Sequence, residues 1–169
     1  MDAHYDELEL QAGQLAAALV ARAARAGVSL ATAESCTAGL VASTIASVPG
    51  ASEVLAGGAV TYCDRVKHEL LGVSSEALAR YTAVSEAVAL EMAEGARKAF
   101  SVDLAVSLTG YAGPGGGTPE DSAGTVYIAV SGGGESACER CVFAGSRNLV
   151  RVQAAIRALE LLCARLPNL

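Results

Sequence analysis

The chain has no tryptophan, and aromatic residues make up only 4% of its 169 residues. It has two histidines and two lysines, so chemistry that needs either type has very few candidates. Charged residues are also scarce, at 18%, and the formal net charge is −6. Because binding to a phosphate backbone needs a broad basic surface, this balance argues against a nucleic-acid partner. An anionic ligand would need a local positive pocket.

Long hydrophobic runs are missing as well. The longest uncharged stretch, residues 35–52, is interrupted by Pro49, Gly50 and several hydroxyl residues, so no membrane span is predicted. The first residues lack the basic start of a signal peptide, and we expect a cytoplasmic protein. Hydrophobic residues still make up 52% of the chain, which predicts one tightly packed domain over residues 1–169. We expect part of this apolar surface to form a homo-oligomer interface.

The five cysteines are scattered and odd in number, which favours reduced thiols over a disulfide framework. Two of them, Cys138 and Cys141, form a CxxC pattern inside a predicted strand. Side chains three residues apart on a strand point to opposite faces, so this pair is predicted to hold no metal and to form no disulfide.

Hydrophobic periodicity predicts the order of helices and strands. Helices are expected at 5–26, within an N-terminal packing segment 1–27, and at 37–48, 64–71 and 147–165. Ser74 and Ser85 are predicted to cap a short and a longer helix between them. Strands are expected at 29–35, 53–62 and 104–108, followed by a hairpin of 123–131 and 135–143. This order predicts an α/β fold: a three-layer α/β/α sandwich with a mixed, mostly parallel sheet and a C-terminal antiparallel hairpin plus helix.

A glycine-rich segment from Thr109 to Thr118 follows the most buried predicted strand. In open α/β sheets, ligands bind outside the carboxyl ends of strands, and glycines let backbone N–H groups approach a phosphate or carbonyl oxygen closely. The segment contains no Gly-Lys-Ser/Thr and precedes no helix, which excludes a Walker A loop and a dinucleotide fingerprint. It indicates a ligand site, and a flexible connection between strands is the alternative.

A second candidate for anion binding is the segment from Phe143 to Arg147, with Arg151 one turn later. Ser146 is predicted to cap the last helix. Two cations at a helix N-terminus oppose the helix dipole, at a cost of about a few tenths of a kcal/mol or more, unless an anion satisfies them. The segment predicts a binding site for a phosphate or a carboxylate. The alternative is that an Asp or Glu from elsewhere in the fold pairs with the two arginines.

Ser35 lies between a predicted strand and a small-residue helix, where a hydroxyl lies next to free backbone N–H groups. An isolated serine is a weak nucleophile and needs a base. His4 lies near the terminus and His68 on a short charged helix, so both are poor candidates. Lys67 is the remaining base, provided that its pKa is lowered, because the position of Lys98 near a helix end is explained by the helix dipole.

The neighbours of this pair allow several interpretations. Tyr62, at the end of a strand, is expected to relay or orient a proton for Lys67. Ser35 also fits a simple helix-capping hydroxyl. Cys36 is a competing nucleophile that we rank lower, because it has no histidine partner. Glu34 is expected either to support Lys67 or to pair with an arginine.

Four motifs in a fixed order, AESCTAGL, GGAVTYCDRVKHELLGV, LTGYAGPGGGTPEDSAGTVY and FAGSRNLVR, resemble the CinA C-terminal domain family, the nicotinamide-mononucleotide deamidases. The resemblance spans residues 30–162. It implies cleavage of the carboxamide of nicotinamide mononucleotide, giving nicotinic acid mononucleotide and ammonia, without a metal or an organic cofactor. It assigns catalysis to Ser35, Tyr62 and Lys67.

Residues from these motifs are also predicted to line the nucleotide site: Glu34, Cys36, Thr37, Gly39, Thr109, Gly110, Ala112, Gly113, Pro114, Gly115, Gly116 and Arg147. In the predicted mechanism, Lys67 takes the proton of Ser35, and backbone donors near residues 36–39 stabilise the oxyanion. The phosphate of the mononucleotide is expected against the glycine-rich segment or against Arg147 and Arg151. A non-catalytic nucleotide-binding or regulatory protein of the same fold is the alternative.

Overall fold

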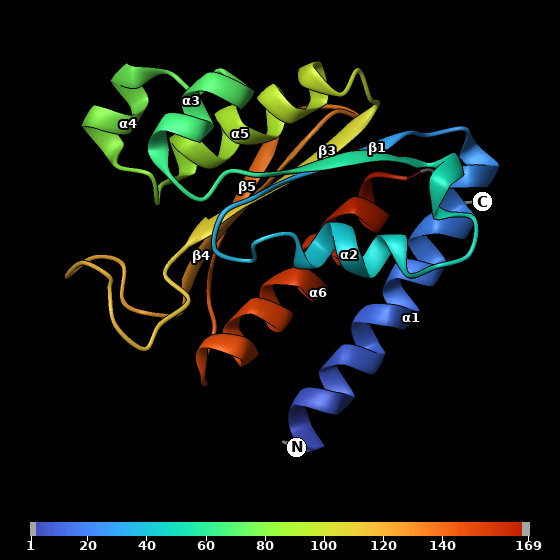
Figure 1. The fold of residues 1–169 in the computed structure, drawn as a ribbon, viewed down its shortest axis with the longest axis horizontal. Coiled ribbons are helices and arrows are strands. Elements are labelled where there is room, and N and C mark those ends of the chain that lie inside the picture. Colours follow the sequence, from blue (N-terminus) through green and yellow to red (C-terminus); the bar gives the residue numbers. More distant parts are fainter. Residues whose placement is uncertain (1–2, 167–169) are drawn as a thin grey trace.

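A five-stranded sheet forms the middle layer of the fold (Figure 1). This computed structural model describes residues 3–166, so Met1, Asp2 and residues 167–169 of the predicted domain lie outside it. The strands lie in the order β2 (Leu55–Val60), β1 (Leu30–Glu34), β3 (Leu104–Gly110), β4 (Thr125–Ser131) and β5 (Ala137–Val142). β1 pairs in parallel with both β2 and β3, whereas β4 pairs antiparallel with β3 and with β5. Among the described strands only β4 is reversed, which confirms the mixed, mostly parallel sheet and its C-terminal hairpin.

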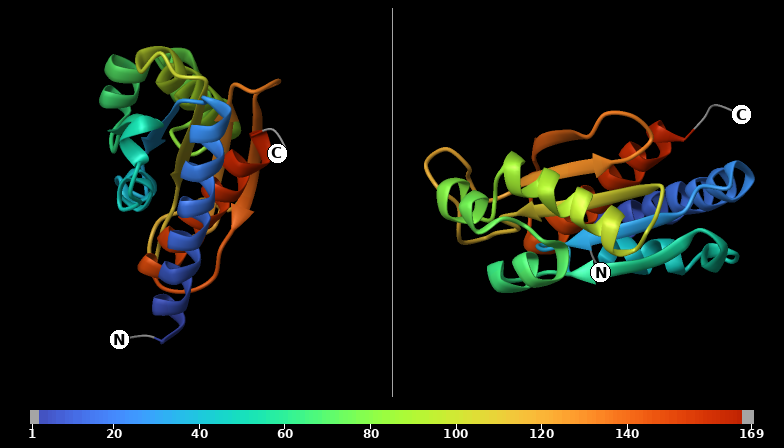
Figure 2. Two further views of the ribbon diagram at one scale, coloured as in Figure 1. Left: turned by 90° about the vertical axis from the view of Figure 1, so that its right-hand side faces the viewer. Right: turned by 90° about the horizontal axis from the view of Figure 1, so that it is seen from above.

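Helices cover both faces of the sheet, and the two further views show the three layers (Figure 2). One face carries α1 (Ala3–Ala26), α2 (Leu40–Ala46) and α6 (Arg147–Arg165), with α1 and α6 packed along each other. The other face carries α3 (Asp64–Leu71), α4 (Ser75–Tyr81) and α5 (Glu86–Ala99). This arrangement is the predicted α/β/α sandwich. Within residues 3–166, no helix combines the length and apolar character that crossing a membrane requires.

The central strand β3 contributes large side chains to the core on one face of the sheet and a small side chain to the core on the other. Its large residues Leu104, Val106 and Leu108 join the core cluster under α1 and α6, and Ala105 faces the cluster under α5. A Cβ at Gly95 of α5 would lie 2.0 Å from the carbonyl oxygen of Leu71, so only glycine permits the observed approach of α5 to α3. α3, which carries Lys67, is thereby packed closely against α5.

Helix caps and one boundary matter for the site. Ser74, Ser85 and Ser146 each accept a hydrogen bond from a backbone N–H at the start of a helix, as predicted. The helix expected at 37–48 begins only at Leu40. Ala38 and Gly39, with φ of 52° and 92°, adopt left-handed conformations that interrupt a helix and form a turn after Ser35. A short 3₁₀ helix, η1 (Ala51–Glu53), likewise precedes β2, whose start was predicted two residues too early.

Candidate active site

Ser35 lies at the carboxyl end of β1, beside the end of the central strand. Its backbone N–H donates to the carbonyl oxygen of Leu108 at 2.9 Å, which fixes the residue where β1 and β3 end together. The Ser35 side chain borders a pocket although the residue is only 9% exposed. Ligands of open α/β sheets bind at this edge, so the position is suited to a nucleophile.

Lys67 lies on α3, and its side-chain amine reaches the Ser35 hydroxyl. Its Nζ lies 3.1 Å from Ser35 Oγ and donates to the carbonyl oxygen of Thr61 at 2.8 Å. The side chain is 1% exposed, and within the described residues no carboxylate forms a salt bridge with it. Burial disfavours the charged form and lowers the pKa of Lys67 from its ordinary value of 10.5, with nearby Asp64 acting in the opposite direction. An amine with a lowered pKa beside a hydroxyl is the arrangement of a serine–lysine pair.

Tyr62 lies on the pocket wall but has a different partner from the one expected. Its hydroxyl oxygen accepts a hydrogen bond from Arg147 at 2.8 Å, and the residue is 58% exposed. No hydrogen bond joins Tyr62 to Lys67 within residues 3–166, so the expected proton relay is not formed in this structure. The Tyr62 side chain is exposed and contacts Arg147, whereas the Lys67 side chain is buried and contacts Ser35 and Thr61.

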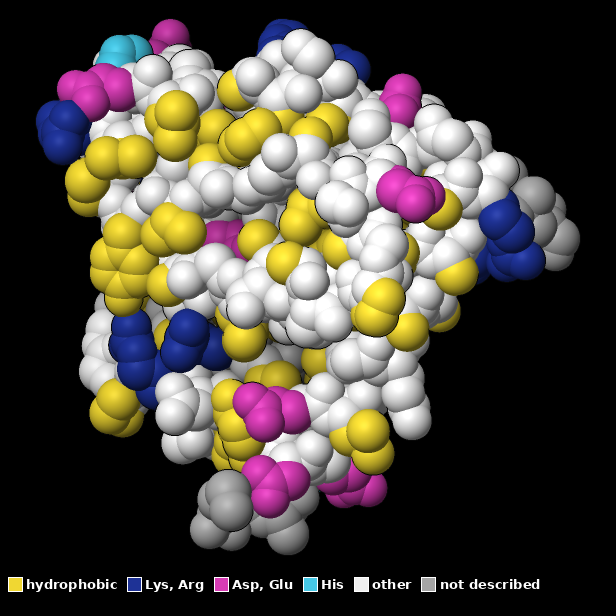
Figure 3. Space-filling model, turned by 45° about the vertical axis from the view of Figure 1, so that its right-hand side comes forward, with side chains coloured by type: hydrophobic (Ala, Val, Ile, Leu, Met, Phe, Trp, Pro, Cys, Tyr) yellow, Lys and Arg dark blue, Asp and Glu magenta, His cyan; other side chains and the backbone are white. Residues whose placement is uncertain are grey.

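Arg147 joins the two segments that the sequence offered as alternative phosphate seats. Besides its contact with Tyr62, it donates to the carbonyl oxygen of Gly113 in the glycine-rich segment at 2.9 Å. Arg151 lies apart from the pocket wall and donates to the carbonyl oxygen of Thr37 at 2.8 Å. In the described part of the chain neither arginine pairs with a carboxylate, so the predicted alternative of an Asp or Glu partner is wrong. Basic side chains occur in separate small groups on the face drawn in Figure 3.

The pocket bordered by Ser35, Tyr62, Lys67 and Arg147 has a volume of about 240 Å³. Many predicted site residues line it: Ser35, Cys36, Tyr62, Lys67, Thr109, Gly110, Ala112, Gly113, Gly115 and Arg147. Thr109 also anchors the wall, because its hydroxyl donates to the carbonyl oxygen of Ala83 at 2.7 Å. The residues that follow β1 and β2, the end of β3, and residues of α3 and α6 thus meet around one cavity.

Other predicted residues do not line this pocket, which corrects their assignment to its wall: Glu34, Thr37, Gly39, Pro114 and Gly116. Pro114 and Gly116 are exposed on the glycine-rich segment, and Thr37 is fully buried within the turn that follows Ser35. Both expectations for Glu34 are wrong, because its carboxylate binds neither Lys67 nor an arginine. It accepts hydrogen bonds from backbone N–H groups at the start of α2, among them that of Gly39.

The backbone donors predicted at residues 36–39 are only partly free. The N–H of Ala38 donates to the carbonyl oxygen of Ser35 at 3.1 Å, and that of Gly39 donates to Glu34 at 3.0 Å. Among the backbone hydrogen bonds of residues 3–166, none is donated to a carbonyl by Cys36 or Thr37. Of the two residues, Cys36 lines the pocket and Thr37 does not, so the N–H of Cys36 is the candidate for binding an oxyanion.

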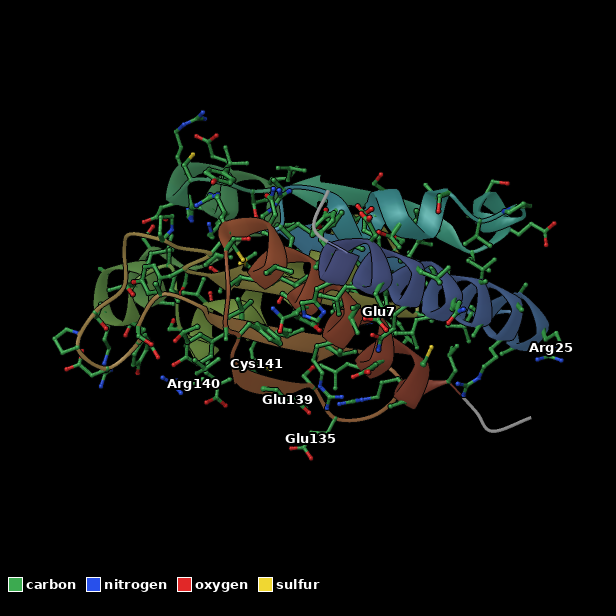
Figure 4. All side chains as sticks on the ribbon, turned by 90° about the horizontal axis from the view of Figure 1, so that it is seen from below. Glu7, Arg25, Glu135, Glu139, Arg140 and Cys141 are labelled. Carbon is green, nitrogen blue, oxygen red and sulfur yellow. The ribbon has the colours of Figure 1, made fainter. Side chains whose placement is uncertain are left out.

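The cysteines do not compete with Ser35 for the role of nucleophile. Burial raises the pKa of the Cys36 thiol to about 11, which keeps it protonated near neutral pH. Cys138 and Cys141 are free. Cys138 packs against the cluster that contains Ala89 and Ala93 of α5, whereas Cys141, labelled in Figure 4, packs against the core cluster on the face of α6. Residues 3–166 contain no cluster of three or more His, Cys, Asp or Glu side chains suited to a metal ion.

Four residues of the pocket wall were missed by sequence reasoning: Asp64, Ala83, Val84 and Tyr111. Asp64 and Tyr111 lie inside recognised motifs, so their spacing from Lys67 and Thr109 was a usable signal. Ala83 and Val84 lie between α4 and α5 and carry no chemical pattern. The hydrogen bond from the Thr109 hydroxyl to the carbonyl oxygen of Ala83 links this segment to the site.

Comparison with known proteins places this chain in a family. Residues 12–166 match the model of the CinA C-terminal domain. The chain belongs to that family. It is 53% identical over 139 residues to a CinA-like protein of Myxococcus xanthus, covering 82% of this chain and 33% of that protein. A CinA-like protein of Anaeromyxobacter dehalogenans is 49% identical over 144 residues, covering 85% of this chain and 35% of that protein. The chain thus spans about a third of the length of these curated relatives.

Solved structures of relatives share both the fold and the length of this chain. The crystal structure of the competence/damage inducible protein CihA from Agrobacterium tumefaciens has a TM-score of 0.89 at 36% identity, covering 92% of this chain and 95% of that chain. A CinA superfamily protein from Escherichia coli has a TM-score of 0.86 at 37% identity, covering 91% of this chain and 89% of that chain. The three-layer fold is therefore that of the CinA family.

Proposed function

We propose that this CinA-family domain hydrolyses the carboxamide of nicotinamide mononucleotide to nicotinic acid mononucleotide and ammonia. The observation that carries the proposal is the 3.1 Å contact between Ser35 Oγ and Lys67 Nζ, two residues that line the pocket. A buried lysine with a lowered pKa supports the role of general base, because lowering the pKa increases the fraction of neutral amine that can accept a proton at a given pH.

The first half of the reaction transfers an acyl group to the serine. Lys67 takes the proton of Ser35 as Oγ attacks the carboxamide carbon, which forms a tetrahedral oxyanion. The N–H group of Cys36, which lines the pocket, is the proposed donor to that oxyanion, and losing such a donor typically lowers the rate about 10²- to 10³-fold. The C–N bond then breaks as Lys67 returns the proton to the leaving nitrogen, so that ammonia departs and an ester remains on Ser35.

The second half removes the acyl group with water. Lys67, neutral again, takes a proton from a water molecule whose oxygen attacks the ester carbon. The ester bond to Ser35 breaks, the proton returns to Oγ, and the acid product leaves, losing its remaining proton to solvent to become the carboxylate. Arg147 is the proposed phosphate ligand, because it is a cation on the pocket wall with no carboxylate partner among the described residues.

Ammonia release from nicotinamide mononucleotide, measured on the purified protein, tests this function. We expect turnover by the wild type and none above background for Ser35→Ala, with substrate binding largely retained by calorimetry. Cys36→Ser is the matched control next to the nucleophile and should keep activity within a few-fold. An active Ser35→Ala variant would falsify the serine mechanism. Thermal stabilisation of the wild type by the nucleotide without ammonia release would instead favour a non-catalytic nucleotide-binding protein.

A further inference from the structure

Glu34 directly precedes the proposed nucleophile, and its carboxylate is fully buried without lining the pocket. One carboxylate oxygen accepts the N–H of Gly39 at 3.0 Å and the N–H of Val41 at 3.1 Å. The other accepts the N–H of Ala42 at 2.9 Å and the hydroxyl of Thr32 at 3.1 Å. Four donors therefore converge on one side chain, and no cation forms a salt bridge with it within residues 3–166.

The Glu34 side chain caps the N-terminus of α2, although Glu34 itself lies in β1. The first N–H groups of a helix have no partner within it, and the residue at the N-cap of α2 is Gly39, which has no side chain to offer. The carboxylate of Glu34 reaches across from the end of β1 and accepts from these groups. Hydrogen bonds to a charged group are roughly twice as strong as neutral ones, and a helix N-terminus favours negative charge.

The same contacts close a short loop that contains the nucleophile. Residues 35–38 run between Glu34 and the N–H groups that its side chain holds, so both ends of this turn are tied to one residue. Within the turn Ala38 adopts φ of 52°, a left-handed conformation that is unfavourable for a non-glycine residue and persists only where its surroundings impose it. Ser35, Cys36 and Thr37 lie in this constrained segment.

We propose that Glu34 is a positioning residue for the reaction: by capping α2 it fixes the 35–39 turn, and so holds Ser35 Oγ against Lys67 Nζ and Cys36 on the pocket wall. Glu34 contacts no reacting atom in this scheme and acts through the backbone. The activity assay below rests on the proposed function, whereas the labelling and exchange measurements do not.

The chain offers two matched controls. Asp103 binds the opposite end of β1 in the same way, because one of its carboxylate oxygens accepts both the N–H and the hydroxyl of Ser29, at 2.8 and 2.7 Å. Asp103→Asn therefore weakens a carboxylate-to-backbone contact far from the pocket. Thr32→Val removes one hydroxyl donor from Glu34 and leaves its three N–H contacts in place.

The decisive variant is Glu34→Gln, which has the same shape but replaces one acceptor oxygen with an NH₂ group that donates. We expect kcat to fall about 100-fold with KM changed less than about threefold, the signature of lost transition-state geometry. Asp103→Asn and Thr32→Val should stay within about threefold of the wild-type kcat. Equal loss in Asp103→Asn at a similar melting temperature, or full activity in a folded Glu34→Gln, overturns the proposal. If Glu34→Gln does not fold, Glu34→Asp, which keeps the charge but shortens its reach, carries the same test.

Two further measurements separate this proposal from the identity of the substrate. Labelling of Ser35 by a fluorophosphonate should slow in Glu34→Gln and not in Asp103→Asn, even if nicotinamide mononucleotide is not the substrate. Amide hydrogen exchange at residues 39–42 needs no reaction at all and should accelerate only in Glu34→Gln. Unchanged exchange there means that Glu34 does not hold the turn. A wild type that is labelled yet releases no ammonia contradicts the proposed function alone.

Discussion

The two lysines of this chain lie in opposite environments. Lys67 is buried, has no carboxylate partner among the described residues and lies 3.1 Å from Ser35 Oγ. Lys98 projects from the end of α5 with its side chain 69% exposed, 3.2 Å from a carboxylate oxygen of Glu94. An exposed ion pair of this kind contributes little to stability, whereas burying an amine without a counter-charge is costly. The comparison shows that burial and the lack of a salt-bridged carboxylate among the described residues, and not residue type, make Lys67 suited to accept a proton.

The largest expected effect comes from removing each amine in turn. Lys67→Met should lower kcat for ammonia release from nicotinamide mononucleotide about 10³-fold, because it deletes the proposed base. Lys98→Met should change kcat less than about twofold. Steady-state kinetics on both variants, with folding checked by circular dichroism, make the comparison. A loss of only a few-fold in Lys67→Met at every pH means that another group accepts the proton.

The same contrast exists between two arginines of α6. Arg147 lines the pocket and forms no salt bridge within the described residues. Arg157, in contrast, forms salt bridges with Glu139 at 2.9 Å and with Glu160 at 2.6 Å. Arg147→Ala should raise KM for nicotinamide mononucleotide roughly 10- to 100-fold, the loss expected for a hydrogen bond to a charged group. Nicotinamide riboside, which lacks the phosphate, should be affected little, and Arg157→Ala should leave both values unchanged. Equal loss with the two substrates places the phosphate elsewhere.

A smaller effect is expected from the carboxylate beside the buried amine. Asp64 is the largest charge that raises the pKa of Lys67 against the effect of burial. Asp64→Asn should therefore lower that pKa further and shift the acid limb of the kcat profile to lower pH. Glu69→Gln, on the same helix and paired with Arg65, is the control. A limb that stays in place, or shifts to higher pH, shows that the limb does not report Lys67.

The smallest expected effect is on stability, and its sign follows from linkage. The pKa of Lys67 in the folded chain lies below the ordinary value of 10.5, so the unfolded chain binds more protons between the two values. The free energy of unfolding of the wild type should therefore rise with pH across that window, and Lys67→Met should lack this gain. Urea denaturation of both proteins at several pH values tests the trend. A difference that does not change with pH contradicts a lowered pKa.

Chemistry that repeats in local motifs could be predicted from the sequence, and contacts that depend on backbone turns could not. The layers followed from alternating strand and helix patterns, and Lys67 was found as the partner of Ser35 because so few bases exist. The role of Glu34 was missed because α2 starts late, after the left-handed Ala38, and hydrophobic periodicity does not detect a positive φ. The bond between Arg147 and Tyr62 joins residues 85 positions apart and required the fold itself.

The protonation of Lys67 is the central claim, and the scarcity of lysine makes it directly measurable. Protein labelled with ¹³C at lysine Cε gives signals from only two lysines, Lys67 and Lys98, and the Lys67→Met variant assigns them. The account predicts that the Lys67 signal titrates at a pH below 10.5, the ordinary value for lysine. A Lys67 signal that titrates at or above that value contradicts the serine–lysine mechanism.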